Sequence, residues 1–348
     1  MTTPTSSSPA LRRQSLTYLP YHELGGRPNV IVDGSPTEGT VLCLTHWPGN
    51  PGLAQFAADL SAQMAFTYLD AYDRHQPARC ASNNHFDQDG LVSLFALVDP
   101  DHARARRSLL VEVARAGDFA TYTSREAARI SMVLAAYADP RRSPLGDLGP
   151  DYDVATGHLY GELLGRLVEL CDHPERFRPL FAREDASLDA SEQALASGAV
   201  TVEEVPDVDL AVIGVPDTGK WTGGHRFASE WVDGLHPMAV YNATDRLAVL
   251  VVQGQRYRFT YRYESWVQYR TRRPRPRVDL SPLAARLEAE EPGHRRWHAD
   301  RVSALTPGLS HDGEASDIAP PVLRCLVEEH LRTAAAAWDP YVAEPAPR

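Results

Sequence analysis

Short apolar runs alternate with helical repeats along the first half of the chain. The runs Asn29–Val32 and Thr40–Thr45 have the length and composition of buried strands, and Arg79–Asn84 is a third, more polar one. Apolar residues at helical spacing follow the second run, from Leu53 to Met64, and the third run, from Leu91 to Val98. This order of strand, loop and helix predicts an α/β region with a mostly parallel sheet.

The pattern changes near Gly198, where short β-branched or aromatic runs replace the helical repeats. They predict strands at Val200–Val205, Asp209–Val215, Met238–Asn242, Leu247–Gln253 and Tyr257–Tyr263, before a helix that begins at Ser281. We therefore expect an α/β domain over residues 16–150, a helical connector over 151–198 and a smaller α+β domain over 199–337. Residues 1–15 and 338–348 are expected to be tails.

Composition narrows the functional classes. The 348 residues include 35 basic and 46 acidic side chains, so the net charge of −11 disfavours nucleic acid as a partner. No apolar run approaches the roughly 20 residues of a membrane helix, and residues 1–15 lack the apolar core of a secretory signal. The four cysteines lie far apart in the sequence, so we expect reduced thiols and a cytoplasmic protein.

The densest polar cluster follows the third predicted strand. It places His85, Asp87 and Asp89 at alternate positions, directly before Gly90 and a predicted helix. Ligand sites of parallel sheets lie at the carboxyl ends of strands, and one imidazole with two carboxylates suits Mn²⁺, Mg²⁺ or Zn²⁺. The cluster therefore predicts a divalent metal site. The alternative is a polar turn whose aspartates only cap the next helix.

Other candidates are more scattered. His46 follows the second predicted strand and would share its edge with His85, so it is a candidate catalytic residue. The alternative is a strand-end histidine that bonds only to backbone groups. The arginines near residue 275 could contact phosphate or single-stranded nucleic acid, but a solvated connector is favoured. They are Arg270, Arg272, Arg273, Arg275 and Arg277.

The motif His85-x-Asp87-x-Asp89-Gly90-x-x-Ser93 resembles the first motif of the DHH phosphoesterase superfamily, whose members hold a pair of manganese ions at a strand end. Gly223-Gly224-His225 is similar to the GGH segment of that superfamily, which contacts substrate phosphate; a turn that requires glycine is the alternative. Ala114–Asp118 resembles the helix end that carries the family's last metal-binding aspartate. The chain lacks the Asp-His-His triplet, and no clear apolar strand ends in an aspartate between Ser93 and Asp118.

The resemblance implies metal-dependent hydrolysis of a phosphoester in a nucleotide or another small phosphorylated molecule. The implied metal is Mn²⁺ first, with Mg²⁺ or Zn²⁺ as alternatives, and the missing triplet could be replaced by His46, His102 or His173. Alternative functions are a metal-dependent enzyme of another reaction type and an inactive protein that binds phosphate or a nucleotide. The implied metal ligands are His85, Asp87, Asp89 and Asp118, the catalytic group adds His46, and the substrate contacts are Ser93, Gly223, Gly224 and His225.

Overall fold

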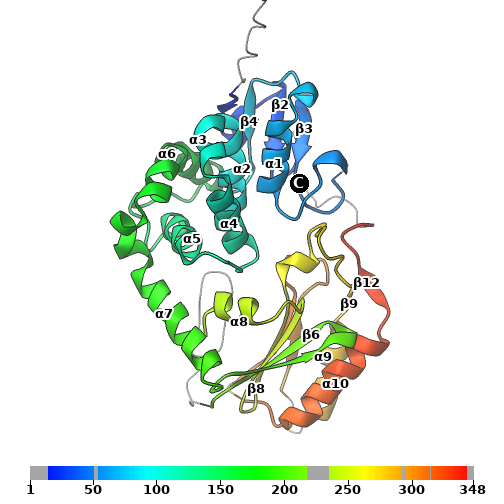
Figure 1. Ribbon diagram of the computed structural model, residues 1–348. Coiled ribbons are helices and arrows are strands. Elements are labelled where there is room, and N and C mark those ends of the chain that lie inside the picture. Colours follow the sequence, from blue (N-terminus) through cyan, green and yellow to red (C-terminus); the bar gives the residue numbers. More distant parts are fainter. Residues whose placement is uncertain are drawn as a thin grey trace, which may run out of the picture.

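The computed structural model describes residues 15–50, 54–217, 235–291, 293, 295–313 and 315–342. It confirms the α/β fold class, because a parallel four-stranded sheet and a mixed six-stranded sheet are both accompanied by helices. Figure 1 shows the two sheets at opposite ends of the molecule, with helix α7 (Arg178–Ala196) running along one side between them. Every residue that the resemblance implies as a metal ligand belongs to the end that holds the parallel sheet.

The parallel sheet has the strand order β1-β4-β2-β3. Strand β2 is buried along its whole length, as expected for an apolar strand inside a parallel sheet. Three of the four strands match predicted runs, whereas β1, only two residues long, was not predicted. The strands are β1 (Thr17–Tyr18), β2 (Asn29–Val32), β3 (Thr40–Leu44) and β4 (Cys80–Ser82).

Helices pack around this sheet with α2 at their centre, in contact with α1, α4, α5 and α6. Helix α2 is buried from Gln88 to Leu97, because its sequence is apolar on all sides. The helices of the predicted connector add Leu163 of α6 and Phe181 of α7 to the same core. The helices are α1 (Ser61–Asp70), α2 (Gln88–Val98), α3 (Pro100–Ala105), α4 (Arg107–Asp118), α5 (Arg125–Ala138) and α6 (Tyr152–Asp172).

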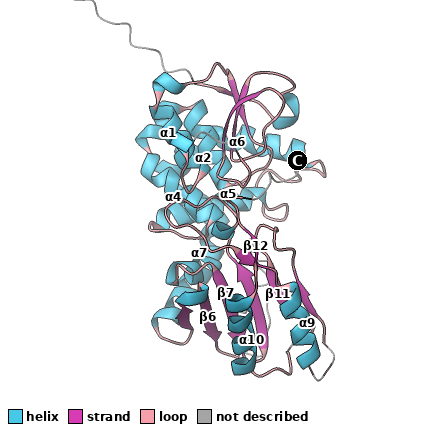
Figure 2. Cartoon of the chain, turned by 90° about the vertical axis from the view of Figure 1, so that its right-hand side faces the viewer, coloured by secondary structure: helices cyan, strands magenta, loops and turns pink. Residues whose placement is uncertain are grey.

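The mixed sheet has the strand order β10-β11-β8-β7-β6-β5, in which only β6 and β7 pair in parallel. Along β8, Tyr257, Phe259 and Tyr261 are buried and alternate with half-buried residues, as their spacing predicts. Helices α9 (Ser281–Glu290) and α10 (Pro320–Thr333) cover the same face (Figure 2). The strands are β5 (Thr201–Val205), β6 (Leu210–Val215), β7 (Ala248–Gln253), β8 (Arg256–Tyr261), β10 (Trp297–Ala299) and β11 (Gly308–His311).

The strand predicted at Met238–Asn242 is wrong, because these residues form helix α8 (Pro237–Ala243). Pro237 occupies the first helical position, where its missing N–H costs nothing, and the Met238 N–H donates to His236 Nδ1 at 3.2 Å. The other face of the sheet is buried against α8, since Val240 packs with Ile213 and Val251.

A segment of the second half of the chain, residues 263–271, leaves the mixed sheet after β8 and packs against the first region. We call this segment the strap. Trp266 is 4% exposed and Val267 is completely buried, and both belong to the core around the parallel sheet. The strap then leads to β9 (Arg277–Val278), which pairs with β12 (Ala336–Trp338) in a small antiparallel sheet.

Backbone hydrogen bonds anchor the strap. The Gln268 N–H donates to the carbonyl oxygen of His46 at 2.8 Å. The buried Asp59 carboxylate accepts from the N–H groups of Arg270 and Thr271 at 2.6 and 2.9 Å, and from the Thr271 hydroxyl at 2.8 Å. One aspartate thus satisfies three donors of the strap, which fixes its position over the end of β3.

Candidate metal centre

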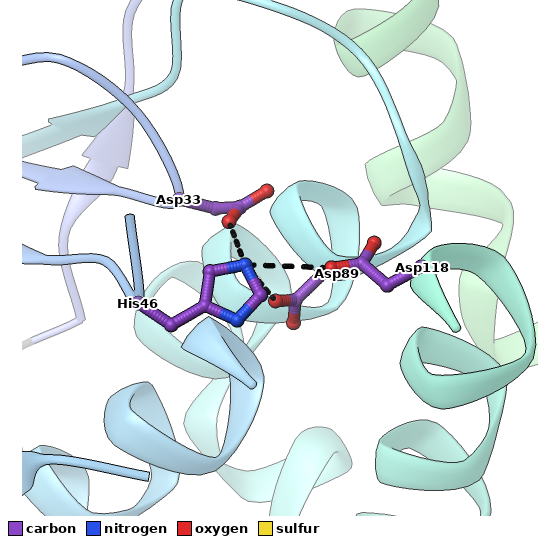
Figure 3. A group of neighbouring side chains, drawn as sticks. All are labelled: Asp33, His46, Asp89 and Asp118. Carbon is purple, nitrogen blue, oxygen red and sulfur yellow. Dashed lines mark ion pairs between the residues drawn. The ribbon is translucent and has the colours of Figure 1, made fainter. Parts of the chain in front are cut away.

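Six side chains meet at the carboxyl edge of the parallel sheet, where strand ends and helix ends converge. Figure 3 shows four of them with their polar atoms facing one another. The sequence had singled out five of the six for this site, and Asp33 is the one it missed. The six are Asp33 after β2, His46 after β3, His85 and Asp87 after β4, Asp89 in the first turn of α2 and Asp118 at the end of α4.

The six side chains form two groups that share Asp33. In each group, one ligand atom per residue lies within 4.8 Å of all the others. Asp33 Oδ1 is 3.4 Å from His46 Nε2, and Asp33 Oδ2 is 3.5 Å from His85 Nε2, so each oxygen faces one group. The first group is Asp33, His46, Asp89 and Asp118, and the second is Asp33, His85 and Asp87.

The spacing in the first group fits one cation. Besides Asp33, His46 Nε2 lies 3.5 Å from Asp118 Oδ2 and 4.0 Å from Asp89 Oδ2. Two ligands that each lie about 2.1 Å from an ion are roughly 3–4.2 Å apart, so these separations are those of atoms around a shared ion. Asp118 Oδ2 is buried without a hydrogen-bond partner among the residues that the structure describes. The group can therefore hold a divalent metal ion.

The tautomer of His46 is fixed by its surroundings. Its Nδ1 lies 2.6 Å from the carbonyl oxygen of Asp59, and a carbonyl can only accept, so Nδ1 carries the hydrogen. The buried Nε2 therefore presents its lone pair to the carboxylates. A backbone carbonyl that orients the imidazole in this way is typical of metal-binding histidines.

The concentrated negative charge of these buried carboxylates destabilises the site when no cation is bound. Burial, followed by the charges of Asp33 and Asp87, raises the pKa of Asp89 well above its usual range, and burial followed by Asp89 does the same for the pKa of Asp118. Burial also opposes ionisation of Asp33, but hydrogen bonding and charge from His85 outweigh it and lower the pKa of Asp33. A bound cation would offset the charges that burial leaves unscreened.

The N-terminus of α1 also holds Asp89. Its two oxygens accept from the N–H groups of Ser61 and Ala62, both at 2.7 Å. The helix that the apolar spacing predicts from Leu53 begins only at Ser61, where a carboxylate from another element takes up its free N–H groups. The Ser61 hydroxyl donates to Asp33 Oδ1 at 2.7 Å, so α1 orients two of the candidate ligands.

The second group faces solvent. The side chains of His85 and Asp87 are 21% and 31% exposed, whereas that of Asp33 is 1% exposed. Asp87 Oδ1 caps α2 by accepting from the Gly90 N–H at 2.7 Å, and its Oδ2 lies 2.8 Å from His85 Nε2. The alternative of a helix cap is thus correct for Asp87 Oδ1, whereas Asp87 Oδ2 remains a candidate metal ligand. Gly90 is required here, because a Cβ would lie 2.5 Å from the Tyr160 hydroxyl.

Asp33 has an unusual backbone. Its φ is 44°, in the left-handed region that non-glycine residues rarely adopt. Such strain costs on the order of 1–3 kcal/mol and concentrates at functional sites. With this backbone conformation, the Asp33 carboxylate at the end of β2 lies between the imidazoles of His46 and His85.

Several candidates lie apart from the cluster. Ser93 is buried one turn further along α2, and its hydroxyl has no partner within the described ranges. His102 is exposed beside Asp99 at 2.8 Å, and His173 follows the end of α6 on the surface, so neither replaces the triplet. Gly223, Gly224 and His225 lie outside the described residues.

The arginine run is engaged within the protein. Arg277 is completely buried and donates to the carbonyl oxygens of Val302, Ala304 and Leu305 at 3.0, 2.6 and 2.8 Å. Arg272 and Arg273 pair with Asp209 and Asp339 at 3.4 and 3.0 Å. A solvated connector is therefore wrong for Arg277, whose Nε also donates to the Ser265 hydroxyl of the strap at 2.8 Å and so joins the strap to the residues after β10.

Tyr263 of the strap also reaches the cluster. Its hydroxyl is 3.5 Å from His46 Nε2, and the two rings meet edge to face with centroids 5.9 Å apart. Burial, followed by the charge of Asp118, raises the pKa of Tyr263 well above its ordinary value, so the phenol keeps its proton. The sequence indicated only that Tyr263 ends an alternating run.

Metal binding should stabilise the protein. An ion present at a hundredfold excess over its dissociation constant adds about 2.7 kcal/mol to the free energy of unfolding. We expect Mn²⁺ to raise, and EDTA to lower, the midpoint of urea unfolding. The His102→Ala variant, whose change lies on the exposed surface of α3, should respond as the parent does. An unfolding midpoint that none of Mn²⁺, Mg²⁺ and Zn²⁺ changes would contradict the metal site.

Comparison with known families places almost the whole chain in one of them. A model described as a family of unknown function (DUF6687) matches residues 14–342, and the chain belongs to this family. Comparisons with curated proteins and with solved structures found no match. Within the described part of the chain, no helix combines the length and the apolarity that crossing a membrane requires.

Proposed function

We propose that this member of the DUF6687 family is a metal-dependent hydrolase that acts on a phosphoester of a nucleotide or another small phosphorylated molecule. The observation that carries the proposal is the sharing of Asp33 between two groups of candidate ligands. Pairs of divalent ions a few Å apart are typical of enzymes that displace groups at phosphorus. Bound at these positions, such ions would lower the pKa of water and offset the charge of phosphate oxygens.

The donor set favours Mn²⁺, with Mg²⁺ or Zn²⁺ as alternatives. Each group supplies one imidazole nitrogen and otherwise carboxylate oxygens, a mixture that suits hard or borderline cations. Neither group includes a cysteine, and all four cysteines are free. Their reduced state fits the cytoplasmic location that we propose for the protein.

The candidate ligands form a buried side and a solvent-facing side of the site. His46, held by the Asp59 carbonyl, and the carboxylates of Asp89 and Asp118 form the buried side of the site. His85 and Asp87 form its solvent-facing side, which is where a substrate can approach. Asp33 lies between the two sides and keeps their spacing fixed.

Two motifs of the DHH resemblance support the proposal. His85, Asp87 and Asp89 stand at a strand end, as in the first motif of that superfamily, and Asp118 ends a helix beside them. No clear apolar strand ends in an aspartate between Ser93 and Asp118. In this chain the strand-end carboxylate comes instead from Asp33, which follows β2 upstream of the first motif. By the same resemblance, we propose that Gly224 and His225 hold substrate phosphate.

The test combines metal analysis with hydrolysis. Protein purified without chelator is analysed for bound metal, then assayed with 4-nitrophenyl phosphate and bis(4-nitrophenyl) phosphate in Mn²⁺ or EDTA. We expect bound metal and Mn²⁺-dependent release of nitrophenol, which Asp87→Asn abolishes and His102→Asn retains. Bound metal with phosphate affinity but no turnover of any phosphoester would indicate an inactive binding protein. Protein without affinity for any of the three metals would overturn the proposal.

A further inference from the structure

We propose that Tyr263 is a catalytic residue that the second half of the chain contributes to the metal centre. Its hydroxyl donates a hydrogen bond to the water or phosphate oxygen that lies in front of His46. This inference rests on the proposed function, since it requires an oxygen ligand at the cluster.

His46 presents a lone pair to the Tyr263 hydroxyl. The Tyr263 hydroxyl lies 3.5 Å from His46 Nε2, which has no hydrogen of its own because Nδ1 donates to Asp59. A cation bound by the Nε2 lone pair would take this acceptor from the hydroxyl, which would remain beside the candidate ligands. The Tyr263 hydroxyl could then donate to an oxygen of water or phosphate held by the same ion.

Several other donors near the cluster are already used. The Ser61 hydroxyl donates to Asp33, and the N–H groups of Ser61 and Ala62 donate to Asp89. Within the described part of the chain, the long contact to His46 is the only hydrogen bond of the Tyr263 hydroxyl. Tyr263 is therefore a donor available to a ligand at the buried side of the site.

The ring of Tyr263 is held in place before any ligand arrives. It stacks on Trp266 with a centroid distance of 5.8 Å and lies 6.2 Å from Phe119. Asp59 connects His46 with the strap that carries Tyr263, because its carbonyl orients His46 while its carboxylate anchors the strap. A donor fixed in advance costs no reorganisation when charge develops on an oxygen, and this is the property that stabilises transition states.

The test uses Tyr263→Phe in the full chain and three measurements. Calorimetric titration gives the affinity for Mn²⁺, then the affinity of the Mn²⁺-loaded protein for inorganic phosphate, and the nitrophenyl assay gives kcat and KM. We expect phosphate affinity and kcat to fall about ten- to hundredfold, the value of one hydrogen bond to a charged group, while Mn²⁺ affinity changes less than about threefold. Tyr269→Phe is the matched control, because Tyr269 lies on the same strap and its ring packs on Phe119 at 5.3 Å.

Each other outcome has a separate meaning. Phosphate affinity and kcat equal to those of the parent would overturn the role of Tyr263 and leave the proposed function intact. A fall in Mn²⁺ affinity with unchanged phosphate affinity would make Tyr263 a metal ligand and would also overturn the inference. A parent protein that binds Mn²⁺ but neither binds phosphate nor hydrolyses esters would contradict both proposals. Equal losses in Tyr269→Phe would assign the effect to packing of the strap.

Discussion

Replacing Asp33 with asparagine should remove metal from both groups, whereas Asp87→Asn should affect only the second. Asp33 offers one oxygen to His46 and the other to His85, so no other residue of the cluster belongs to both groups. We expect two ions per chain in the parent, one in Asp87→Asn and less than about a tenth of the parent's content in Asp33→Asn. Mass spectrometry of the native protein measures these contents directly.

The metal-free proteins provide the control. The charge of Asp33 raises the pKa values of Asp89 and Asp118, and its loss relieves that repulsion even as the contact with His85 weakens. These two effects of the substitution oppose each other, so in EDTA Asp33→Asn should still unfold in one cooperative transition, as the parent does. Equal metal contents in Asp33→Asn and Asp87→Asn would show that the two groups do not share a carboxylate.

Asp59→Ala should cost about 3 kcal/mol of unfolding free energy in EDTA, because it leaves two N–H groups and one hydroxyl of the strap without their acceptor. The change removes no candidate ligand, and the carbonyl that orients His46 remains in the backbone. Urea unfolding followed by tryptophan fluorescence measures the loss, since Trp266 lies on the strap.

Thr271→Val is the control for this prediction. It deletes one of the three hydrogen bonds to Asp59 and keeps both N–H donors paired, so we expect a loss of about 1 kcal/mol. If Asp59→Ala costs no more than Thr271→Val, the carboxylate does not anchor the strap.

Local patterns predicted β2 and β8 well, because these strands carry their burial in their own sequence, whereas β3, expected to be buried, is an edge strand on which Val41 is exposed. Helix starts depended on distant residues. Apolar spacing from Leu53 indicated a helix, but α1 begins at Ser61, where the carboxylate of Asp89 caps it from another element. Apolar spacing at Met238–Asn242 was equally consistent with strand and helix, and Pro237 decided for the helix.

Local sequence patterns likewise indicated some residues of the candidate site and missed others. Strand-end reasoning found His46 and the motif at His85, since both directly follow predicted strands. The same rule applied to Asn29–Val32 would have found Asp33, which directly follows that run. Tyr263 carried no such signal, because its place depends on the chain turning away from the sheet after Tyr261.

The strap has a consequence for how the protein is made. All six candidate ligands precede residue 119, whereas the segment that packs over them starts at residue 263. A ribosome adds about 5–20 residues per second, so the complete ligand set precedes its covering segment by on the order of ten seconds. During that interval the carboxylates and imidazoles are open to the surrounding solution, and cations can exchange freely. The arrival of the strap covers the first group, because Tyr263 packs against His46, whereas His85 and Asp87 stay partly exposed, so metal in the finished protein exchanges through their side of the site.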